Sequence, residues 1–226
     1  MIFKNSEIER IHFSLQSGSV TELSQSEQPR SEFRLQRAKN TRRAGALLLS
    51  GGIIFTVFNT IAEAVYPNYS VRTNALSDLG ALGHSTSILW DGQLFVGGVL
   101  SIIAMSILVF RSSLSEFVPG KPVKILYLLP SVGTIIVSIF PENTILAVHS
   151  IGALIAFVFG GVSAIYAFKF TKSPFRYFSI LLGVISLAAI PLLGDSSLIG
   201  FGGMERLVVY PYVIWGMTFG AYLTAT

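Results

Sequence analysis

Six long apolar runs constrain this chain more than any other feature of its sequence. A helix that crosses a bilayer needs about 20 mostly apolar residues. Runs of that kind lie at 44–66, 90–110, 123–140, 144–168, 175–193 and 204–224. Only 12% of the residues are charged, whereas a soluble domain carries about 25%. The sequence therefore predicts an all-α integral membrane protein, built as a bundle of six transmembrane helices.

The positions of lysine and arginine predict which way this bundle faces. Fourteen of the 16 lie in three regions that six spans would place on one side of the membrane: eight in residues 1–43, three in 111–124 and three in 169–176. Membrane insertion selects cytoplasmic loops that are rich in lysine and arginine. We therefore expect a cell-membrane protein with both termini in the cytoplasm. The loops that hold Arg72 and Arg206 would then lie outside.

The first 43 residues differ in composition from the rest of the chain. They are rich in Ser, Glu, Gln and Arg and lack the apolar core of a signal peptide. We predict a basic, mostly disordered cytoplasmic tail over 1–43 and a transmembrane domain over 44–226. The net charge is +4, and the cations cluster at predicted membrane borders. That position favours membrane lipids as partners over nucleic acid.

Polar or small residues recur at helical spacing in three of the spans. Steps of three or four residues place each set on one face of its helix. Such a face is either a packing seam, because small residues let helices approach closely, or the wall of a polar cavity. The outer ends of the sets hold ionisable residues, which favours a cavity that opens outward. The sets are Gly52, Thr56, Asn59 and Glu63; Ser131, Thr134, Ser138 and Glu142; and His149, Ala153, Ala156, Gly160 and Ser163.

The ionisable residues outside the three basic regions all fall on the predicted outer side. Ionisable groups at membrane depth are costly, so they are usually paired or functional. The members are Glu63, Arg72, Asp78, His84, Asp91, Glu142, His149, Asp195, Glu205 and Arg206. The long loop between the first two spans favours a re-entrant or interfacial turn at 74–80, where Gly80 and Gly83 supply backbone freedom. In the same loop, Asn68-Tyr69-Ser70 matches a glycosylation acceptor at Asn68.

Four short motifs then occur in a characteristic order along the chain. They are Tyr66-Pro67, Ser77-Asp78-Leu79-Gly80, Phe140-Pro141-Glu142 followed by His149, and Gly203-Met204-Glu205-Arg206 before a helix with Trp215. Together they resemble the domain of unknown function 998 family, small membrane proteins found largely in archaea and some bacteria. The resemblance covers about 44–224 and implies that Ser77, Asp78, Glu142, His149, Glu205 and Arg206 match signature positions of the family. It implies no established activity.

The Ser-Asp-Leu-Gly turn also looks like a motif of Frag/Dram-type six-span proteins, some of which are tied to lipid-anchor remodelling. A hydrolase would use Ser77 as nucleophile and His149 as base, with Asp78 or Glu142 as the acidic partner. Arg206 suits a phosphate or carboxylate, and the predicted substrate-binding group is Arg206, Glu205, Glu63 and Asn59. A metal site would use His149 with two carboxylates among Glu142, Asp78 and Glu205, and the first choice is His149, Glu142 and Asp78. Catalytic zinc sites are usually richer in histidine, so we expect no metal and no other cofactor.

Two other interpretations stay open beside the hydrolase. In a structural network, Glu205 and Arg206 pair with Glu142, Asp78 or residues near them and order the first outer loop. A small-solute transporter is the third interpretation, although no acid or lysine lies in mid-span, where a proton relay would need one. The sequence thus predicts a multi-pass membrane protein with an outward-facing polar cluster that is either structural or lipid-binding. Whether the protein is an enzyme stays open.

Overall fold

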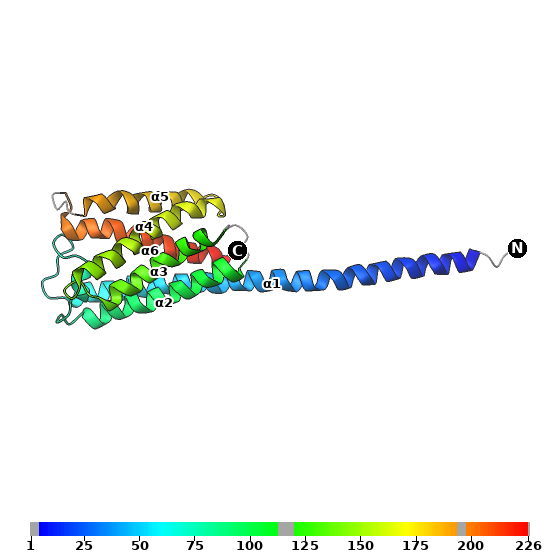
Figure 1. Cartoon of the computed structure of the whole chain (residues 1–226), viewed down its shortest axis with the longest axis horizontal. Helices are drawn as coiled ribbons and strands as arrows, with labels where there is room; N and C mark the ends of the chain where they lie inside the picture. The colour runs from blue at the N-terminus through cyan, green and yellow to red at the C-terminus, as the bar shows by residue number, and fades with distance from the viewer. Residues whose placement is uncertain (1–4, 113–119, 194–197, 226) are drawn as a thin grey trace.

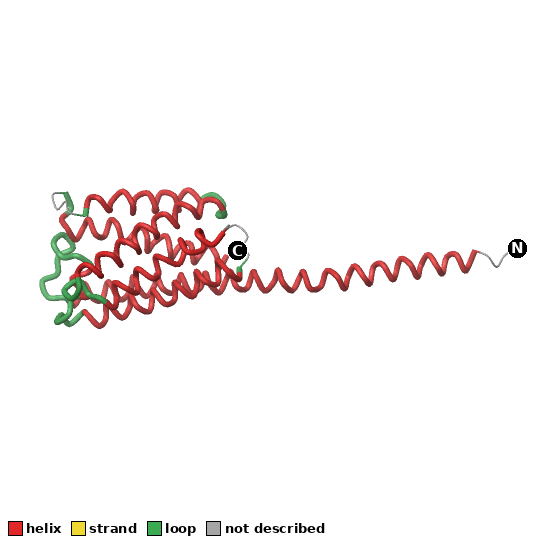
Figure 2. The backbone as a smooth tube through the Cα atoms, in the orientation of Figure 1, coloured by secondary structure: helices red, strands yellow, loops and turns green. Residues whose placement is uncertain are grey.

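The computed structural model describes residues 5–112, 120–193 and 198–225, with side chains for 30–112, 122–193 and 198–225. Lys4 and Asp195 therefore lie outside the described residues. Within those residues the regular structure is all helical, as Figure 2 shows, and the predicted all-α fold is confirmed. The long helices are α1 (Asn5–Val65), α2 (Ser87–Arg111), α3 (Gly120–Ile139), α4 (Leu146–Tyr166), α5 (Phe175–Ala189) and α6 (Gly200–Ala225). Short 3-10 helices are η1 (Ser77–Gly80), η3 (Ala167–Lys169) and η4 (Ile190–Leu192).

Six helical segments are long and apolar enough to cross a membrane, as predicted. They are Arg30–Val65, Ser87–Arg111, Pro122–Ile139, Leu146–Lys169, Phe175–Leu192 and Gly200–Ala225. The first differs from the predicted run because α1 begins well before it and projects beyond the bundle (Figure 1). The structure describes the backbone of 5–43 as helix, where the sequence predicts a mostly disordered tail. The division of the chain at residue 43 stays a prediction.

The six helices pack as a closed ring. Each long helix contacts the next one along the chain, and α6 returns to contact α1. A weaker contact joins α4 to α6 across the ring. Because α1 and α6 are neighbours, residues more than 140 positions apart in the sequence meet at this seam.

Glycines allow the α1–α6 seam to close. A Cβ atom added to Gly45 of α1 would lie 2.7 Å from the Gly220 carbonyl oxygen, and one added to Gly220 would lie 2.6 Å from the Gly45 carbonyl oxygen. Real Cβ atoms do not approach backbone so closely, so neither position has room for a larger residue. Small residues thus let the two backbones touch, as is common between membrane helices.

The two ends of the ring differ in their charge. The tail end, from which α1 projects, carries Arg111, Lys124, Lys169, Lys172 and Arg176 in or beside its connections. The loop end consists of the loop 66–86, the turn 140–145 and the described residues 190–193 and 198–199, and it lies opposite (Figure 1). Of the described cations, only Arg72 and Arg206 belong to the loop end. The charge separation predicted from the sequence is therefore present in the fold.

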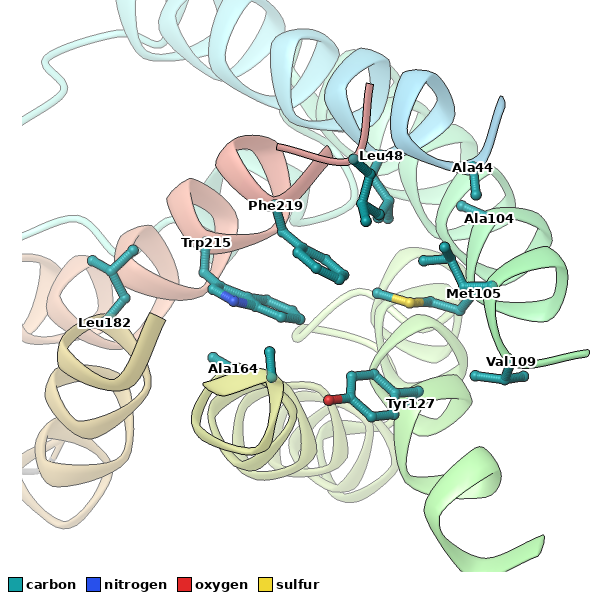
Figure 3. Packing of buried hydrophobic residues seen from close by; sticks show 13 residues of the cluster. Ala44, Leu48, Ala104, Met105, Val109, Tyr127, Ala164, Leu182, Trp215 and Phe219 are labelled. Carbon is teal, nitrogen blue, oxygen red and sulfur yellow. The ribbon is translucent and has the colours of Figure 1, made fainter. Parts of the chain in front are cut away.

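An apolar core fills the half of the ring near the tail end. Trp215 and Phe219 of α6 point between the helices toward Met105 of α2 and Tyr127 of α3 (Figure 3). The Trp215 and Phe219 rings stack with centroids 5.2 Å apart. The Trp215 indole N–H also donates to Ser179 Oγ at 2.7 Å, which joins α6 to α5.

The loop 66–86 folds back over its end of the ring. Its centre is η1, which fits the predicted turn, and Gly83 adopts a positive φ of 97°. Gly80 was expected to supply similar freedom, and this expectation is wrong, because Gly80 has no positive φ. Its role is close packing, since an added Cβ would lie 2.6 Å from the Trp90 ring. The loop is therefore seated on the start of α2.

Candidate functional site

Polar side chains from α1, the loop 66–86 and α6 meet inside the loop end. We call this group the polar cluster, and its members are Asn59, Glu63, Tyr69, Glu205, Arg206 and Tyr210. Asn59 and Arg206 are buried, and the other members are partly buried. Asn59 and Glu63 are four residues apart on α1, as are Arg206 and Tyr210 on α6, so each pair projects from one helix face. The α1–α6 seam brings the two faces together.

The Arg206 guanidinium lies at the centre of the polar cluster. Its Nη2 group donates to Glu63 Oε1 at 2.8 Å and to the Tyr69 hydroxyl. Its Nη1 group donates to the carbonyl oxygens of Gly202 at 2.7 Å, Asn74 at 3.0 Å and Val71 at 3.3 Å. Only Nε, which is also buried, has no partner among the described residues. Both terminal nitrogens are therefore occupied by acceptors of the protein itself.

Glu63 and Asn59 extend the cluster along α1. Asn59 Nδ2 donates to Glu63 Oε1 at 3.2 Å, and Asn59 Oδ1 accepts from the Trp90 indole N–H at 3.2 Å. The Tyr210 hydroxyl donates to Glu63 Oε1 at 3.5 Å. Several donors thus converge on one carboxylate oxygen, which compensates for taking this charge out of water.

Glu205 holds the loop 66–86 from the opposite side. Its carboxylate accepts a short hydrogen bond from the Leu76 backbone N–H. The Ser77 hydroxyl and backbone N–H also face this carboxylate. Within the loop, Asp78 Oδ2 accepts from Asn74 Nδ2 at 3.0 Å and from the Ala75 backbone N–H at 3.1 Å. Glu205 and Asp78 therefore both serve the local conformation of the loop.

The backbone of α6 approaches the same loop closely. Gly202 N donates to the Arg72 carbonyl at 3.2 Å. A Cβ atom added to Gly202 would lie 2.0 Å from the Asn74 carbonyl oxygen, so only glycine fits at this position. The Arg72 side chain bonds the Leu198 carbonyl at 3.3 Å. The start of α6 and the loop thus form one packed unit.

A second pair of acids lies beside the polar cluster. Burial raises the pKa of the Glu142 carboxyl to about 7, and the neighbouring Asp78 carboxylate also raises it, whereas the Ser77 hydroxyl lowers it. Like charges held close together cannot both ionise freely. Glu142 therefore holds a proton over much of the range below neutral pH, and the group of Asp78, Glu142 and Ser77 has one acid able to give up a proton near pH 7.

His149 lies buried near the start of α4. Its Nδ1 is 2.8 Å from the Phe140 carbonyl oxygen, within the same helical hairpin. This contact joins the turn 140–145 to α4. Within the described part of the chain, no hydrogen bond joins His149 to Ser77, Asp78 or Glu142.

The proposed catalytic residues therefore fall into two groups. Ser77, Asp78 and Glu142 lie together, and His149 bonds a backbone carbonyl instead of the serine. The proposed substrate-binding residues Arg206, Glu205, Glu63 and Asn59 meet, but they bond to one another and to the loop. Among the described residues, no group of three or more His, Cys, Asp or Glu side chains is arranged to hold a metal ion. Asn68 is exposed at the loop end, with a positive φ of 55°, and its glycosylation stays a prediction.

Sequence reasoning missed three members of this region. Tyr69 touches both Arg206 and Glu63, Tyr210 lies one turn from Arg206, and Trp90 bonds Asn59. Spacing was a usable signal for Tyr210, since it lies on the face of α6 that carries Arg206. Tyr69 offered no such signal, because its place depends on how the loop folds back.

Comparison with known proteins gives one match. A family model described as "Protein of unknown function (DUF998)" matches residues 49–222, a range that includes all four motifs noted in the sequence. No curated protein and no solved structure matches the chain. The interpretation of the site therefore depends on its own geometry.

Proposed function

This chain belongs to the DUF998 family, and we propose that it binds a membrane lipid within its helix bundle and that its polar cluster is a structural clamp. On this proposal the clamp holds the loop 66–86 over one end of the ring and carries out no chemistry. The loop end faces outward from the cell membrane, because lysine and arginine gather at the tail end.

One observation supports the structural clamp: acceptors of the protein itself already bond the Arg206 guanidinium. An arginine that binds a phosphate or carboxylate presents its planar fork to the ligand. Here both terminal nitrogens already donate to Glu63, Tyr69 and loop carbonyls. A substrate would have to displace an ion pair between the buried Arg206 and the partly buried Glu63, which leaves a carboxylate without its partner and is unfavourable. The geometry therefore favours a fixed tie over a binding site for an anion.

Lipid binding is proposed because the chain is a six-span membrane protein whose polar groups at the loop end are used internally. The bundle is surrounded by lipid along its length, so a lipid reaches its helices without passing the loop end. Membrane lipid, the partner predicted from the sequence, remains the proposed partner. The proposed place of contact lies inside the ring and not at the loop end.

The test starts from full-length protein purified in detergent. We expect mass spectrometry to find a membrane lipid that stays bound through washing in a fixed ratio to protein. We also expect the lipid profile of cells with and without the protein to show no lost substrate and no new product. Recovery of protein free of lipid, or a clear substrate and product pair, would overturn the proposal. His149→Gln serves as a control that should fold and retain the lipid.

A second candidate is lipid remodelling at the loop end, and the Glu142 carboxyl favours it. An acid with a pKa of about 7 is suited to general acid–base catalysis near neutral pH, and the Ser77 hydroxyl lies beside it. If this candidate holds, Ser77→Ala protein loses hydrolysis of added phospholipid while it still folds, as cooperative thermal unfolding shows. Equal lipid turnover by wild-type and Ser77→Ala protein would reject it.

A further inference from the structure

A cavity of about 120 Å³ lies within the ring, between α1, α2, α3 and α6. Its walls are mostly apolar, and glycines make room for it. Gly97 of α2 and Gly216 of α6 line it, and a Cβ atom added to either would contact nothing within 4 Å. Both glycines, like Gly51 of α1, are partly exposed at the surface of the bundle. The cavity is therefore open toward the bilayer on one side.

One side chain in the wall has unsatisfied hydrogen-bonding groups. Gln93 of α2 is only 5% exposed, and both its Oε1 and its Nε2 are buried without a partner. An unpaired amide inside a membrane protein is costly, so such a group normally has a partner. Among the described residues, none bonds the Gln93 amide, and Gln93 borders the cavity.

Gln93 places an unpaired amide at one end of the cavity. The hydroxyls of Ser101, Thr134 and Tyr212 also line the cavity, but they have partners within the protein. Gln93 lies one helical turn from Trp90, whose indole bonds Asn59 of the polar cluster. Away from this end, the lining passes Phe55, Leu94 and Val213 and reaches Met217. A molecule that fills the cavity therefore needs one polar group near Gln93 and a hydrocarbon chain that extends from there toward Met217.

We propose that this cavity binds a long-chain fatty acid in its protonated form, with the carboxyl group paired to the Gln93 amide. A neutral carboxyl has an acceptor and a donor side by side, so its C=O accepts from Nε2 while its O–H donates to Oε1. A hydroxyl or an ester does not offer both groups in this spacing. The lining contains no charged residue, so a carboxylate would have no cation to compensate it.

The hydrocarbon chain of the fatty acid lies along Gly51, Gly97 and Gly216 in the cavity wall. A dry cavity of roughly 150 Å³ accommodates benzene, so a cavity of about 120 Å³ holds the carboxyl group and the first few methylenes. The rest of the chain leaves past the partly exposed glycines into the bilayer. This inference rests on the proposed function, since it names the ligand class and the place of lipid binding.

The experiment measures binding of radiolabelled palmitic acid to full-length protein in phosphatidylcholine nanodiscs, at mildly acidic pH. We expect saturable binding by the wild type and roughly tenfold weaker binding by Gln93→Leu, which loses two neutral hydrogen bonds. Palmitic acid methyl ester, which lacks the donor, should bind the wild type more weakly than the acid. Gln93→Leu should bind the acid and the ester equally well.

Glycine variants test the place of binding. Gly97→Leu adds a side chain to open space in the cavity wall and should abolish binding. Gly92→Leu is the matched control, because Gly92 lies on the same helix, an added Cβ there also meets nothing within 4 Å, and it does not line the cavity. The thermal midpoint of each variant shows that it is folded, and that of Gln93→Leu should be at least as high as the wild-type midpoint.

The outcomes separate this inference from the proposed function. Unchanged binding of palmitic acid by Gln93→Leu or Gly97→Leu overturns the fatty-acid site, and the proposed function stands if the protein still retains another lipid. A water molecule that satisfies the Gln93 amide in place of a lipid would leave the wild type without saturable binding of palmitic acid, and that result also overturns the fatty-acid site. Purified protein that retains no lipid and binds no palmitic acid overturns both.

Discussion

The two ends of this helix ring differ in the interactions that hold them together. At the tail end, aromatic rings such as Trp215 and Phe219 pack in an apolar core. At the loop end, Leu76, Leu79 and Trp90 also pack in an apolar cluster, and a partly buried ion pair between Arg206 and Glu63 additionally joins the first and last helices. Both ends therefore depend on packed volume, and the loop end depends in addition on keeping both partners of an ion pair.

The largest effect is expected from Arg206→Ala at the loop end. This change leaves the partly buried Glu63 carboxylate without its cation and removes the donors to the loop carbonyls. Breaking a fully buried pair costs roughly 3–5 kcal/mol, and the 22% exposure of Glu63 lowers that figure. Chemical denaturation of the purified protein would measure the loss. The double variant Glu63→Gln/Arg206→Met should recover much of it, because neither charge then remains. An unfolding midpoint of Arg206→Ala equal to that of the wild type would show that the ion pair does not close this end.

A smaller effect is expected from Trp215→Phe at the tail end. The change removes the indole N–H that donates to Ser179 Oγ at 2.7 Å and leaves a smaller ring at a site that is 1% exposed. The lost hydrogen bond costs about 1 kcal/mol, and the unfilled volume adds to this loss. The loss should be the same at every pH, unlike effects at the loop end. Tyr177→Phe is a control, because this side chain is 66% exposed and lies on the neighbouring helix. Equal unfolding midpoints of Trp215→Phe and Tyr177→Phe would show that the Trp215 indole does not stabilise the tail end.

A further effect, confined to one range of pH, should be the pH dependence that Glu142 gives to the loop end. Its pKa rises from 4.5 to about 7 on folding because of burial, so the folded state binds more protons than the unfolded state between these values. Stability should therefore fall as pH rises from about 4.5 to about 7. In Glu142→Gln this slope should be absent, as measured by thermal midpoints across the range. A slope that persists in the variant would assign it to another group.

Most of the fold could be predicted from the sequence, because it follows from local composition. Twenty apolar residues are enough to identify a span, and the clustering of cations separates the two ends. The shared helix face of Asn59 and Glu63 could also be predicted, since it depends only on spacing. The beginning of α1 is different, because apolar content does not mark where a polar segment joins a helix.

The pairing inside the site could not be predicted in the same way. The sequence grouped Arg206 with Glu63 as substrate-binding residues and offered Glu142 and Asp78 among its possible partners in a structural network, but it did not single out the ion pair with Glu63. That choice depends on the return of α6 to α1, a property of the whole ring that no local pattern contains. Gln93 did carry a signal, as the only amide side chain in the span Ser87–Arg111, but its lack of a partner needs coordinates.

The seam between α1 and α6 also sets an order of assembly. Glu63 is synthesised 143 residues before Arg206, so it enters the membrane with the first span and stays without its cation until the last helix is inserted. A chain that stops after α5 therefore keeps a carboxylate, an open edge and an unanchored loop. The final helix supplies the cation, closes the edge and anchors the loop at once, so the loop end is complete only when α6 is in place.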